Sequence, residues 1–372
     1  MLFYLTIFIV LFLFCVFDYV KDISALKKFL IFIFGLFFVL VAGLRWKTGT
    51  DWGTYYDYFS SVQTVFGTPM NTFEAGFSYL NLFVRNVTSN YTILLLISAI
   101  LIIPGKFKFF GKYTALPLLA IFLYYAYFFC DIFFVRQSIA ITFTLLSTKY
   151  IIERKLLLFA LFVYIASLFH GSAILFIFSY FIFNLKISNK FLILLLLASV
   201  VCRIIDLDIR MLQLISGYLG FNEYLNNKMT EYLQGGEDQT FGMGVSKGMV
   251  LVLGILKRAI IFPFFFWFRN KISADETKVY NGYLNLLVMG TCLYFLTGNF
   301  VALQRISTYF FVYEILLIVL VVKNIQQKTV RSLAYMFIFL FAFTKFYYGF
   351  SGYKDLYIPY YSVFDTKNIN RY

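Results

Sequence analysis

Apolar runs long enough to cross a bilayer recur along nearly the whole chain, and they constrain its fold more than any other feature. The first run, LFYLTIFIVLFLFCVF, starts at residue 2 and contains no charge. A transmembrane helix needs about 20 mostly apolar residues. Because 61% of the chain is hydrophobic and only 13% is charged, about half the charge of a soluble domain, we predict an all-α polytopic membrane protein.

The runs predict about twelve transmembrane helices in a single integral domain, residues 1–372. The sequence lacks the period-two alternation of apolar and polar residues that is typical of a β-barrel. The first run lacks a basic leader and a cleavage site, which predicts a retained helix. The predicted helices are 2–20, 29–44, 78–104, 114–130, 132–150, 156–170, 171–184, 190–205, 247–268, 279–298, 301–322 and 333–350.

Lysine and arginine in alternate short loops predict the orientation, because such loops face the cytoplasm. One of these basic loops holds Lys106, Lys108 and Lys112. The formal charge of +14 is therefore assigned to topology, and no nucleic-acid partner is expected. The opposite, outer side then carries 45–77, a long loop at 206–246 and the tail 351–372. That loop is predicted to be either a lid or a passive linker.

The stretch GLRWKTGTDWGTYYDYF, residues 43–59, combines charges with aromatic rings where an apolar run ends. Such a composition suits a site for a charged substrate that carries rings. The alternative is an interfacial aromatic belt with snorkelling charges. In the first interpretation Trp52 and Tyr55 contact the substrate.

Three arginines lie at one predicted depth on the outer side: Arg45, Arg136 and Arg305. A charged residue inside an apolar segment is costly and usually has a function, and the guanidinium fork suits phosphate. Together they suggest a diphosphate site. For Arg136 the alternative is a structural pair with Asp131.

Few residues are candidates for a general base. His170 is the only histidine and follows an apolar run on the outer side; it is either a general base or a structural residue. Asp51 and Glu74 are the other candidates. The four cysteines lack CxxC spacing and no metal-ligand cluster occurs, so no metal is predicted. Glu314, Lys257 and Arg258 are expected to form a buried charge network.

Several short segments, in this order, resemble the EpsG family of Wzy-type bacterial polysaccharide polymerases. The resemblance extends over nearly the whole chain, except that 206–246 and the helix before it carry no recognisable motif. The segments are GLRWKTGTDWGTYYDYF, EAGFSYLN (74–81), VRQSIAITF (135–143), FHGSA (169–173), QRISTYF (304–310) and IPYYSVF (358–364).

The resemblance implies a GT-C-like bundle with an outward-facing cavity in the bacterial inner membrane. Such an enzyme moves a growing glycan from undecaprenyl diphosphate onto a lipid-linked repeat unit at the periplasmic face, without nucleotide sugar, metal or cofactor. Arg45, Arg136 and Arg305 would hold diphosphate, Trp52 and Tyr55 would stack on sugar rings, and His170 or Asp51 would act as base. Glu74 would also bind substrate. A chain-length regulator and a flippase are the expected protein partners, and membrane lipid surrounds the chain.

Two rival functions remain open. A ligase that moves the finished glycan to another acceptor needs the same arginine-lined site. A flippase or transporter of lipid-linked oligosaccharide needs polar residues reaching both faces, whereas most of those noted here lie on one side.

Overall fold

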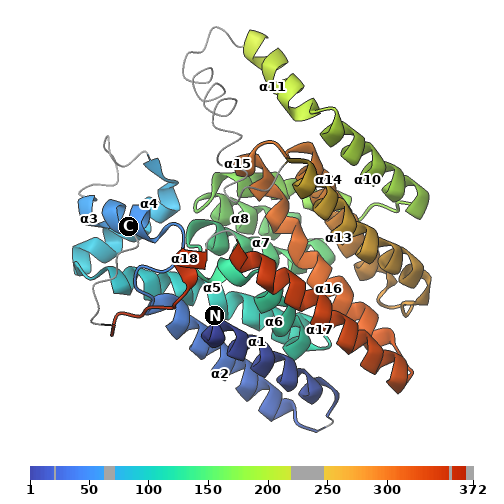
Figure 1. The fold of residues 1–372 in the computed structure, drawn as a ribbon, viewed down its shortest axis with the longest axis horizontal. Helices are drawn as coiled ribbons and strands as arrows, with labels where there is room; N and C mark the ends of the chain where they lie inside the picture. The colour runs from blue at the N-terminus through green and yellow to red at the C-terminus, as the bar shows by residue number, and fades with distance from the viewer. Residues whose placement is uncertain (21, 63–71, 219–246, 352–353, 366–372) are drawn as a thin grey trace. The chain divides into compact units, whose positions relative to one another are not determined.

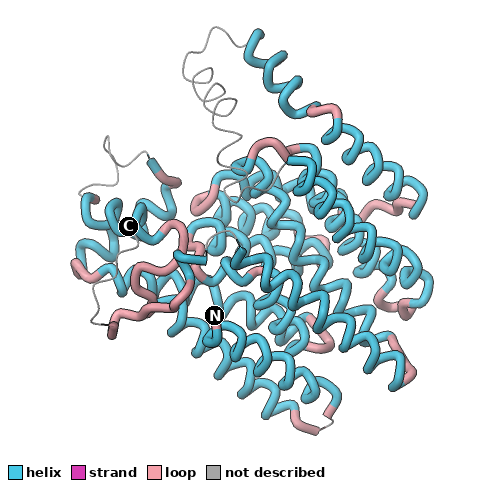
Figure 2. Tube along the Cα trace, viewed as in Figure 1, coloured by secondary structure: helices cyan, strands magenta, loops and turns pink. Residues whose placement is uncertain are grey.

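The computed structural model describes residues 1–20, 22–62, 72–218, 247–351 and 354–365. Over these residues the chain forms helices and no strand, and the β-type pairing is an isolated bridge between Arg45 and Ser362 (Figure 2). The all-α class is therefore confirmed. Within the described ranges, seven helices are long and apolar enough to cross a membrane: Leu2–Tyr19, Ser24–Gly43, Tyr91–Tyr113, Gly248–Lys271, Thr277–Leu296, Arg305–Asn324 and Lys328–Gly349.

These helices make the chain a multi-pass membrane protein. The number of about twelve spans and the GT-C-like bundle stay predictions. Shorter apolar helices cover Pro117–Tyr127, Leu156–Ser167 and Gly171–Ile182. The chain divides into two compact units. The first contains Met1–Ile177 and Ile325–Tyr372, and the second contains Phe178–Asn324. The single integral domain likewise stays a prediction.

The first unit is built around the buried helix α6 (Pro117–Tyr127). Four helices pack against it: α1 (Leu2–Phe14), α2 (Ser24–Gly43), α5 (Tyr91–Tyr113) and α17 (Lys328–Ser351). The Asp18 carboxylate accepts hydrogen bonds from the backbone N–H groups of Leu118 and Leu119, at 3.3 and 2.9 Å. These groups have no partner within their own helix, so the carboxylate caps α6. With 11 residues, α6 is only about 16 Å long, too short to span the bilayer core.

Figure 1 follows the helices in chain order. In the first unit they are α1 (Leu2–Phe14), η1 (Cys15–Tyr19), α2 (Ser24–Gly43), α3 (Trp52–Ser61), α4 (Ala75–Val87), α5 (Tyr91–Tyr113), α6, η3 (Phe129–Ile132), α7 (Arg136–Ile152), α8 (Leu156–Ser167), η4 (Gly171–Phe178, whose last residue begins the second unit), α17 (Lys328–Ser351) and α18 (Lys354–Tyr357).

The observed boundaries of α4 and α5 differ from those of the predicted helix in this region. The predicted helix 78–104 is two helices, α4 and α5, separated at Thr88–Asn90, where the Asn90 side chain accepts the Thr92 N–H at 3.0 Å. Helix α5 also continues through Pro104 as far as Tyr113. The basic loop expected at 106–112 is therefore helical, and Lys106 is fully buried.

The second unit contains helix α14 (Thr277–Leu296), along which α10 (Asn189–Ile204) and α16 (Thr308–Asn324) pack. The predicted outer loop 206–246 begins with the helix α11, and 219–246 lie outside the described residues, so the lid and the linker both stay predictions. The remaining elements are α9 (Ser179–Ile182), α11 (Leu207–Tyr218), α13 (Lys247–Phe268), η5 (Arg269–Lys271), α15 (Val301–Gln304) and η6 (Arg305–Ser307).

Candidate functional site

Arg136 lies at the first residue of α7, where the chain leaves the α6–α7 connection. Its Nε–H donates to the Tyr55 hydroxyl at 3.0 Å, and its Nη1 donates to Glu74 Oε2 at 2.6 Å. The guanidinium carbon lies 4.4 Å from the centre of the Phe73 ring. The guanidinium is therefore held on one face by an aromatic ring and on one edge by two oxygen acceptors.

Glu74 connects Arg136 to a second loop of the first unit. It stands at the N-cap position of α4, and its Oε1 accepts the Gly171 N–H at 3.0 Å. Burial raises the pKa of the Glu74 carboxyl, but the Arg136 charge and the Gly171 N–H outweigh burial and leave the pKa below its usual value of 4.5. Glu74 is therefore ionised at neutral pH, and its negative charge stays paired with the positive charge of Arg136.

Tyr55 connects Arg136 to Asp51, which lies one helical turn earlier at the start of α3. The buried Tyr55 hydroxyl, which accepts from Arg136, donates to Asp51 Oδ2 at 3.3 Å. Burial, followed by the Asp51 charge, raises the pKa of Tyr55 to about 12. Tyr55 consequently stays protonated near neutral pH and acts as a hydrogen-bond relay between Arg136 and Asp51.

His170 precedes the glycine that contacts Glu74. Its Nδ1 lies 2.8 Å from the Ser172 hydroxyl, and the backbone nearby is fixed because the Gly76 N–H donates to the Leu168 carbonyl at 2.7 Å. A Cβ atom on Gly76 would stand 2.7 Å from that oxygen, so the close approach requires glycine. The structure thus gathers Asp51, Tyr55, Glu74 and Arg136, with His170 one residue from the cluster.

Arg136 keeps donors for a ligand. Its side chain is 19% exposed, and among the described residues its hydrogen bonds use Nε and Nη1. The Nη2 group makes none there. A guanidinium with one edge fixed and the other edge available is preorganised for a bidentate anion, because the side chain loses little further freedom on binding.

Trp52 lies beside this cluster in a group of stacked rings. It is buried, its ring lies parallel to that of Tyr56 at 5.1 Å, and it meets the edges of Trp46 and Tyr91. Tyr56 is partly exposed. Trp52 therefore supports Tyr56, which is the more accessible surface for a sugar ring.

Arg45 occupies a different environment from Arg136. It is buried, its Nη1 donates to the carbonyls of Ala42 and Ile132 at 3.3 and 3.4 Å, and its guanidinium lies 5.7 Å from the centre of the Phe133 ring. Arg45 thus ties the end of α2 to the connection that leads to Arg136. Its predicted contact with diphosphate stays a prediction.

A late segment of the chain pairs with residues 44–49. The Trp46 N–H donates to the Tyr361 carbonyl and the Val363 N–H donates to the Leu44 carbonyl, both at 2.9 Å. Gly49 donates to Leu356 at 3.0 Å with φ +106°, a conformation that favours glycine. We call residues 356–363 the tail strap. The backbone pairing of the tail strap places most of the IPYYSVF segment beside the 43–59 stretch.

Arg305 belongs to the second unit, where it starts η6 and is exposed.

In the same unit Glu314 is buried and close enough for its charge to act on Arg258. The rest of the expected charge network, which includes Lys257, stays a prediction. Elsewhere in this unit Asp206 and Asp208 both accept hydrogen bonds from Asn299, and Arg203 pairs with Asp206.

Sequence reasoning missed the buried charge pair beneath Arg136. Lys106 forms an ion pair with Asp131, lies 3.3 Å from the Tyr124 hydroxyl and donates to the Ser138 hydroxyl at 2.8 Å. Asp131 therefore pairs with Lys106, and the carboxylate partner of Arg136 is Glu74. The available signal was a lysine inside a long apolar run, which carries a higher cost than a loop lysine.

Comparison with known proteins gives one match. The model of a family described as the EpsG family matches residues 28–362. This range includes every residue of the cluster around Arg136, as well as the tail strap except Val363. No curated protein and no solved structure gives a significant match.

Proposed function

We propose a glycan-polymerising function for this chain, because it belongs to the EpsG family, the family of Wzy-type polysaccharide polymerases. The family supports a polysaccharide polymerase-like role. The specific reaction that we propose is transfer of a growing glycan from undecaprenyl diphosphate to a lipid-linked repeat unit at the periplasmic face of the bacterial inner membrane. The oriented Arg136 fork is the observation that supports this chemistry most directly.

The reaction breaks a bond between an anomeric carbon and a diphosphate oxygen, so negative charge accumulates on the leaving phosphate. A fixed cation beside that oxygen stabilises the transition state more than the ground state. Arg136 has the required donors at its Nη2 edge, which takes part in no hydrogen bond with the described residues. In this proposal Glu74 and Tyr55 hold the guanidinium at the correct angle, so that little reorganisation accompanies the reaction.

Glu74 is compatible with anion binding at Arg136. A guanidinium has five N–H donors, and Glu74 takes one of them. The carboxylate also lowers the net charge of the site, which limits the strength of ground-state diphosphate binding and favours product release. Arg305 is a second candidate for the diphosphate of the donor or the acceptor.

The attacking sugar hydroxyl loses a proton during the transfer. His170 and Asp51 are the proposed bases, because both lie within or next to the Arg136 cluster and are at least partly accessible. Such a base contributes roughly 10²–10⁴-fold to the rate. Tyr56, supported by Trp52, offers a ring face to the sugar.

The test uses a strain in which the gene is deleted and then supplied as wild type, Arg136→Ala or Arg154→Ala. Arg154 is the matched control because it is exposed just beyond the end of α7. Glycans are extracted and sized on a gel, and membrane levels of each variant are compared.

We expect Arg136→Ala to leave single repeat units on the carrier while Arg154→Ala gives the wild-type ladder. Long chains in the Arg136→Ala strain at equal protein level would remove Arg136 from the mechanism. Long carrier-linked chains in the deletion strain would identify a ligase, and loss of carrier-linked sugar from the outer face would identify a flippase.

A further inference from the structure

A groove of about 540 Å³ lies in the first unit, between α17 and the segment formed by α1 and η1. Its two walls belong to helices of membrane-spanning length, Leu2–Tyr19 and Lys328–Gly349. Three of the lining side chains are strongly exposed: Leu13 and Val16 at 63% and Met336 at 59%. Apolar side chains on the surface of a multi-pass membrane protein contact lipid, so the groove opens to the bilayer.

The groove has a polar end and an apolar end. At the polar end Tyr19 finishes η1, and Arg331 and Ser332 lie near the start of α17. At the other end the rings of Phe12 and Phe339 pack with their centres 4.6 Å apart. Because Tyr19 and Arg331 lie close to the ends of two spanning helices, the polar end is at the depth of the bilayer interface and the apolar end is within the hydrocarbon.

Arg331 supplies a cation at the polar end. Its Nε and Nη2 donate to the Ile325 carbonyl at 3.2 and 2.6 Å, and its guanidinium carbon lies 4.5 Å from the centre of the Tyr19 ring. With the residues that the structure describes, Nη1 makes no hydrogen bond and the side chain forms no ion pair. The side chain is partly exposed. Since a carbonyl and a ring already fix the guanidinium, its Nη1 donors can bind an anion with little further loss of freedom.

The surroundings of Arg331 also favour an anion. Lys328 is exposed at the start of α17, and a helix start carries partial positive charge. Lys27 donates to the Asp18 carbonyl at 3.0 Å, which places another cation beside η1. The Asp18 carboxylate itself caps α6 with both oxygens. The charge at this end of the groove is therefore positive.

Two hydroxyl groups beside Arg331 lack partners. Tyr19 and Tyr335 both line the groove, and their ring centres are 5.9 Å apart. Both hydroxyl oxygens are buried and have no hydrogen-bond partner among the described residues. Buried polar groups are nearly always paired with protein, water or a ligand, so the polar end is a place where a bound polar group completes the hydrogen bonding.

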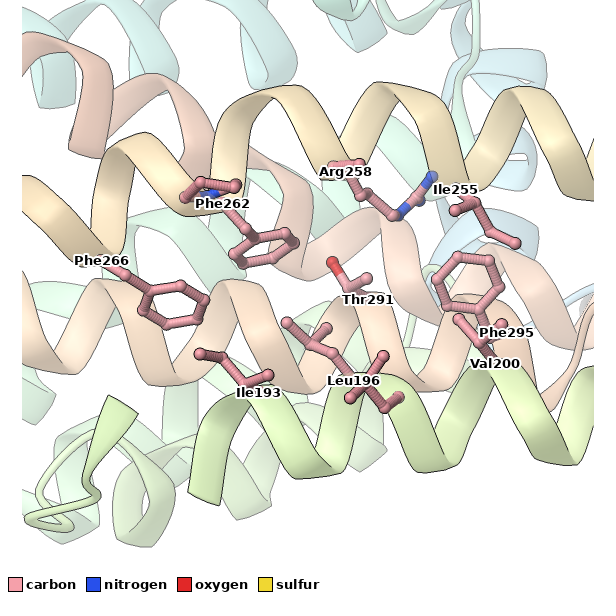
Figure 3. Close-up of a pocket in the computed structure, with 12 residues that line it drawn as sticks. Ile193, Leu196, Val200, Ile255, Arg258, Phe262, Phe266, Thr291 and Phe295 are labelled. Atoms are coloured by element: carbon pink, nitrogen blue, oxygen red, sulfur yellow. The ribbon is translucent and has the colours of Figure 1, made fainter. Parts of the chain in front are cut away.

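A second groove, of about 400 Å³ in the second unit, lacks this polarity. It lies between α10, α13 and α14, and its lining is apolar apart from Arg258 and Thr291 (Figure 3). The Arg258 guanidinium packs 3.9 Å from the centre of the Tyr294 ring, and its Nη1 donates to the Gly254 carbonyl at 3.0 Å. Its charge is already held by a ring and a carbonyl, so we assign no ligand to this groove.

We infer that the groove between η1 and α17 binds one anionic phospholipid of the bilayer, with the lipid phosphate on Arg331 and an acyl chain along Phe12, Met336 and Phe339. The depth of the polar end favours a bilayer lipid over free phosphate, because the apolar end continues into the hydrocarbon. The positive surroundings favour an anionic headgroup over a zwitterionic one. The site is separate from the Arg136 cluster, and the inference does not depend on the proposed function.

The experiment measures lipid binding to the purified full-length protein in detergent by native mass spectrometry. Phosphatidylglycerol is compared with phosphatidylcholine of the same acyl chains, which is zwitterionic, and with inorganic phosphate, which has no chain. We expect phosphatidylglycerol to bind about tenfold more tightly than phosphatidylcholine, the lower end of the effect of a charge-assisted hydrogen bond. Inorganic phosphate should bind more weakly than either lipid.

Four variants accompany the lipids. Arg331→Gln should reduce phosphatidylglycerol binding to the level of phosphatidylcholine, whereas Arg331→Lys keeps the charge, loses the fork on Ile325 and should keep the preference. Val16→Trp narrows the apolar part of the groove and should weaken binding of both lipids. Lys28→Gln is the matched control, because Lys28 is an exposed cation next to Lys27 and does not line the groove.

Equal binding of the two lipids by the wild type, or an unchanged preference in Arg331→Gln, would overturn the inference. Inorganic phosphate that binds as tightly as phosphatidylglycerol would identify a free-anion site and would also overturn it. Loss of the preference in Arg331→Lys as well would assign Arg331 a purely structural role. If Arg331→Gln fails to fold, the wild type and Arg331→Lys still decide, because both retain the charge that the inference requires.

Discussion

Removal of the Lys106 charge should destabilise the protein strongly, because it leaves a carboxylate without a counter-ion in the core of the first unit. Lys106 is 0% and Asp131 3% exposed. Breaking a buried ion pair by deleting one partner costs about 3–5 kcal/mol. The Tyr124 hydroxyl, at 2.5 Å from Asp131, would remain and offset part of that cost. We therefore expect Lys106→Met to lose about 3 kcal/mol, the lower end of that range.

The assay is thermal unfolding of the purified protein in detergent, followed by the loss of the monodisperse elution peak. A loss of about 3 kcal/mol corresponds to a fall in Tm of roughly 4 °C, because a chain of 372 residues unfolds with an entropy of about 2.1 cal/mol/K per residue. The double variant Lys106→Met/Asp131→Asn removes both charges and keeps an acceptor for Tyr124. It should be more stable than Lys106→Met by about 1–3 kcal/mol, the usual coupling of two contacting residues.

Lys108→Met is the matched control, because Lys108 lies two residues further along α5 and is exposed. Its Tm should stay within about 1 °C of the wild type, as for most exposed substitutions. The reasoning would be refuted if Lys106→Met melted with the control, or if the double variant were no more stable than Lys106→Met.

Three further predictions concern the site and its frame. The pKa of Glu74 is lower in the folded protein than its usual value of 4.5. Its contribution to stability is therefore complete above pH 4.5 and is lost as the pH falls through the lower folded pKa. Tm should consequently fall between pH 7 and pH 3, and the fall should be smaller in Glu74→Gln. Gly49→Ala forces a side chain into φ +106° with its Cβ 3.4 Å from Phe133 and should cost about 1–2 kcal/mol. Gly248→Ala should not lower Tm, because its Cβ would meet no atom of the other described parts of the chain within 4 Å. Tyr55→Phe removes the hydroxyl between Arg136 and Asp51, so polymer yield should fall while membrane level is kept; an unchanged ladder would show that Arg136 needs no support from Tyr55.

The sequence predicted the helical membrane class because long apolar runs leave few alternatives in lipid. It also singled out Arg136, Glu74, Tyr55 and Asp51, since polar groups within or next to apolar runs are costly unless they have a role. Their meeting could not be predicted, because three of them come from a stretch and a helix start that are separated from α7 by more than sixty residues.

Other features escaped for identifiable reasons. The predicted helix 78–104 ended too early, because α5 continues through Pro104 to Tyr113, and Lys106 was therefore wrongly assigned to a loop. Asp131 is nearer to Arg136 in sequence than Glu74 is, yet the α6–α7 connection turns it towards Lys106. The groove beside Arg258 depends on how three helices pack, which periodicity alone does not give.

The tail strap has a consequence for how the protein matures during synthesis. Residues 356–363 leave the ribosome after nearly every membrane segment has been inserted, yet they supply the backbone partners of Leu44, Trp46 and Gly49. The earlier segment therefore stays without these partners until the later one has been made. A product that ended before residue 356 would contain the seven long apolar helices found in the described part of the chain and would still lack the backbone partners of Leu44, Trp46 and Gly49.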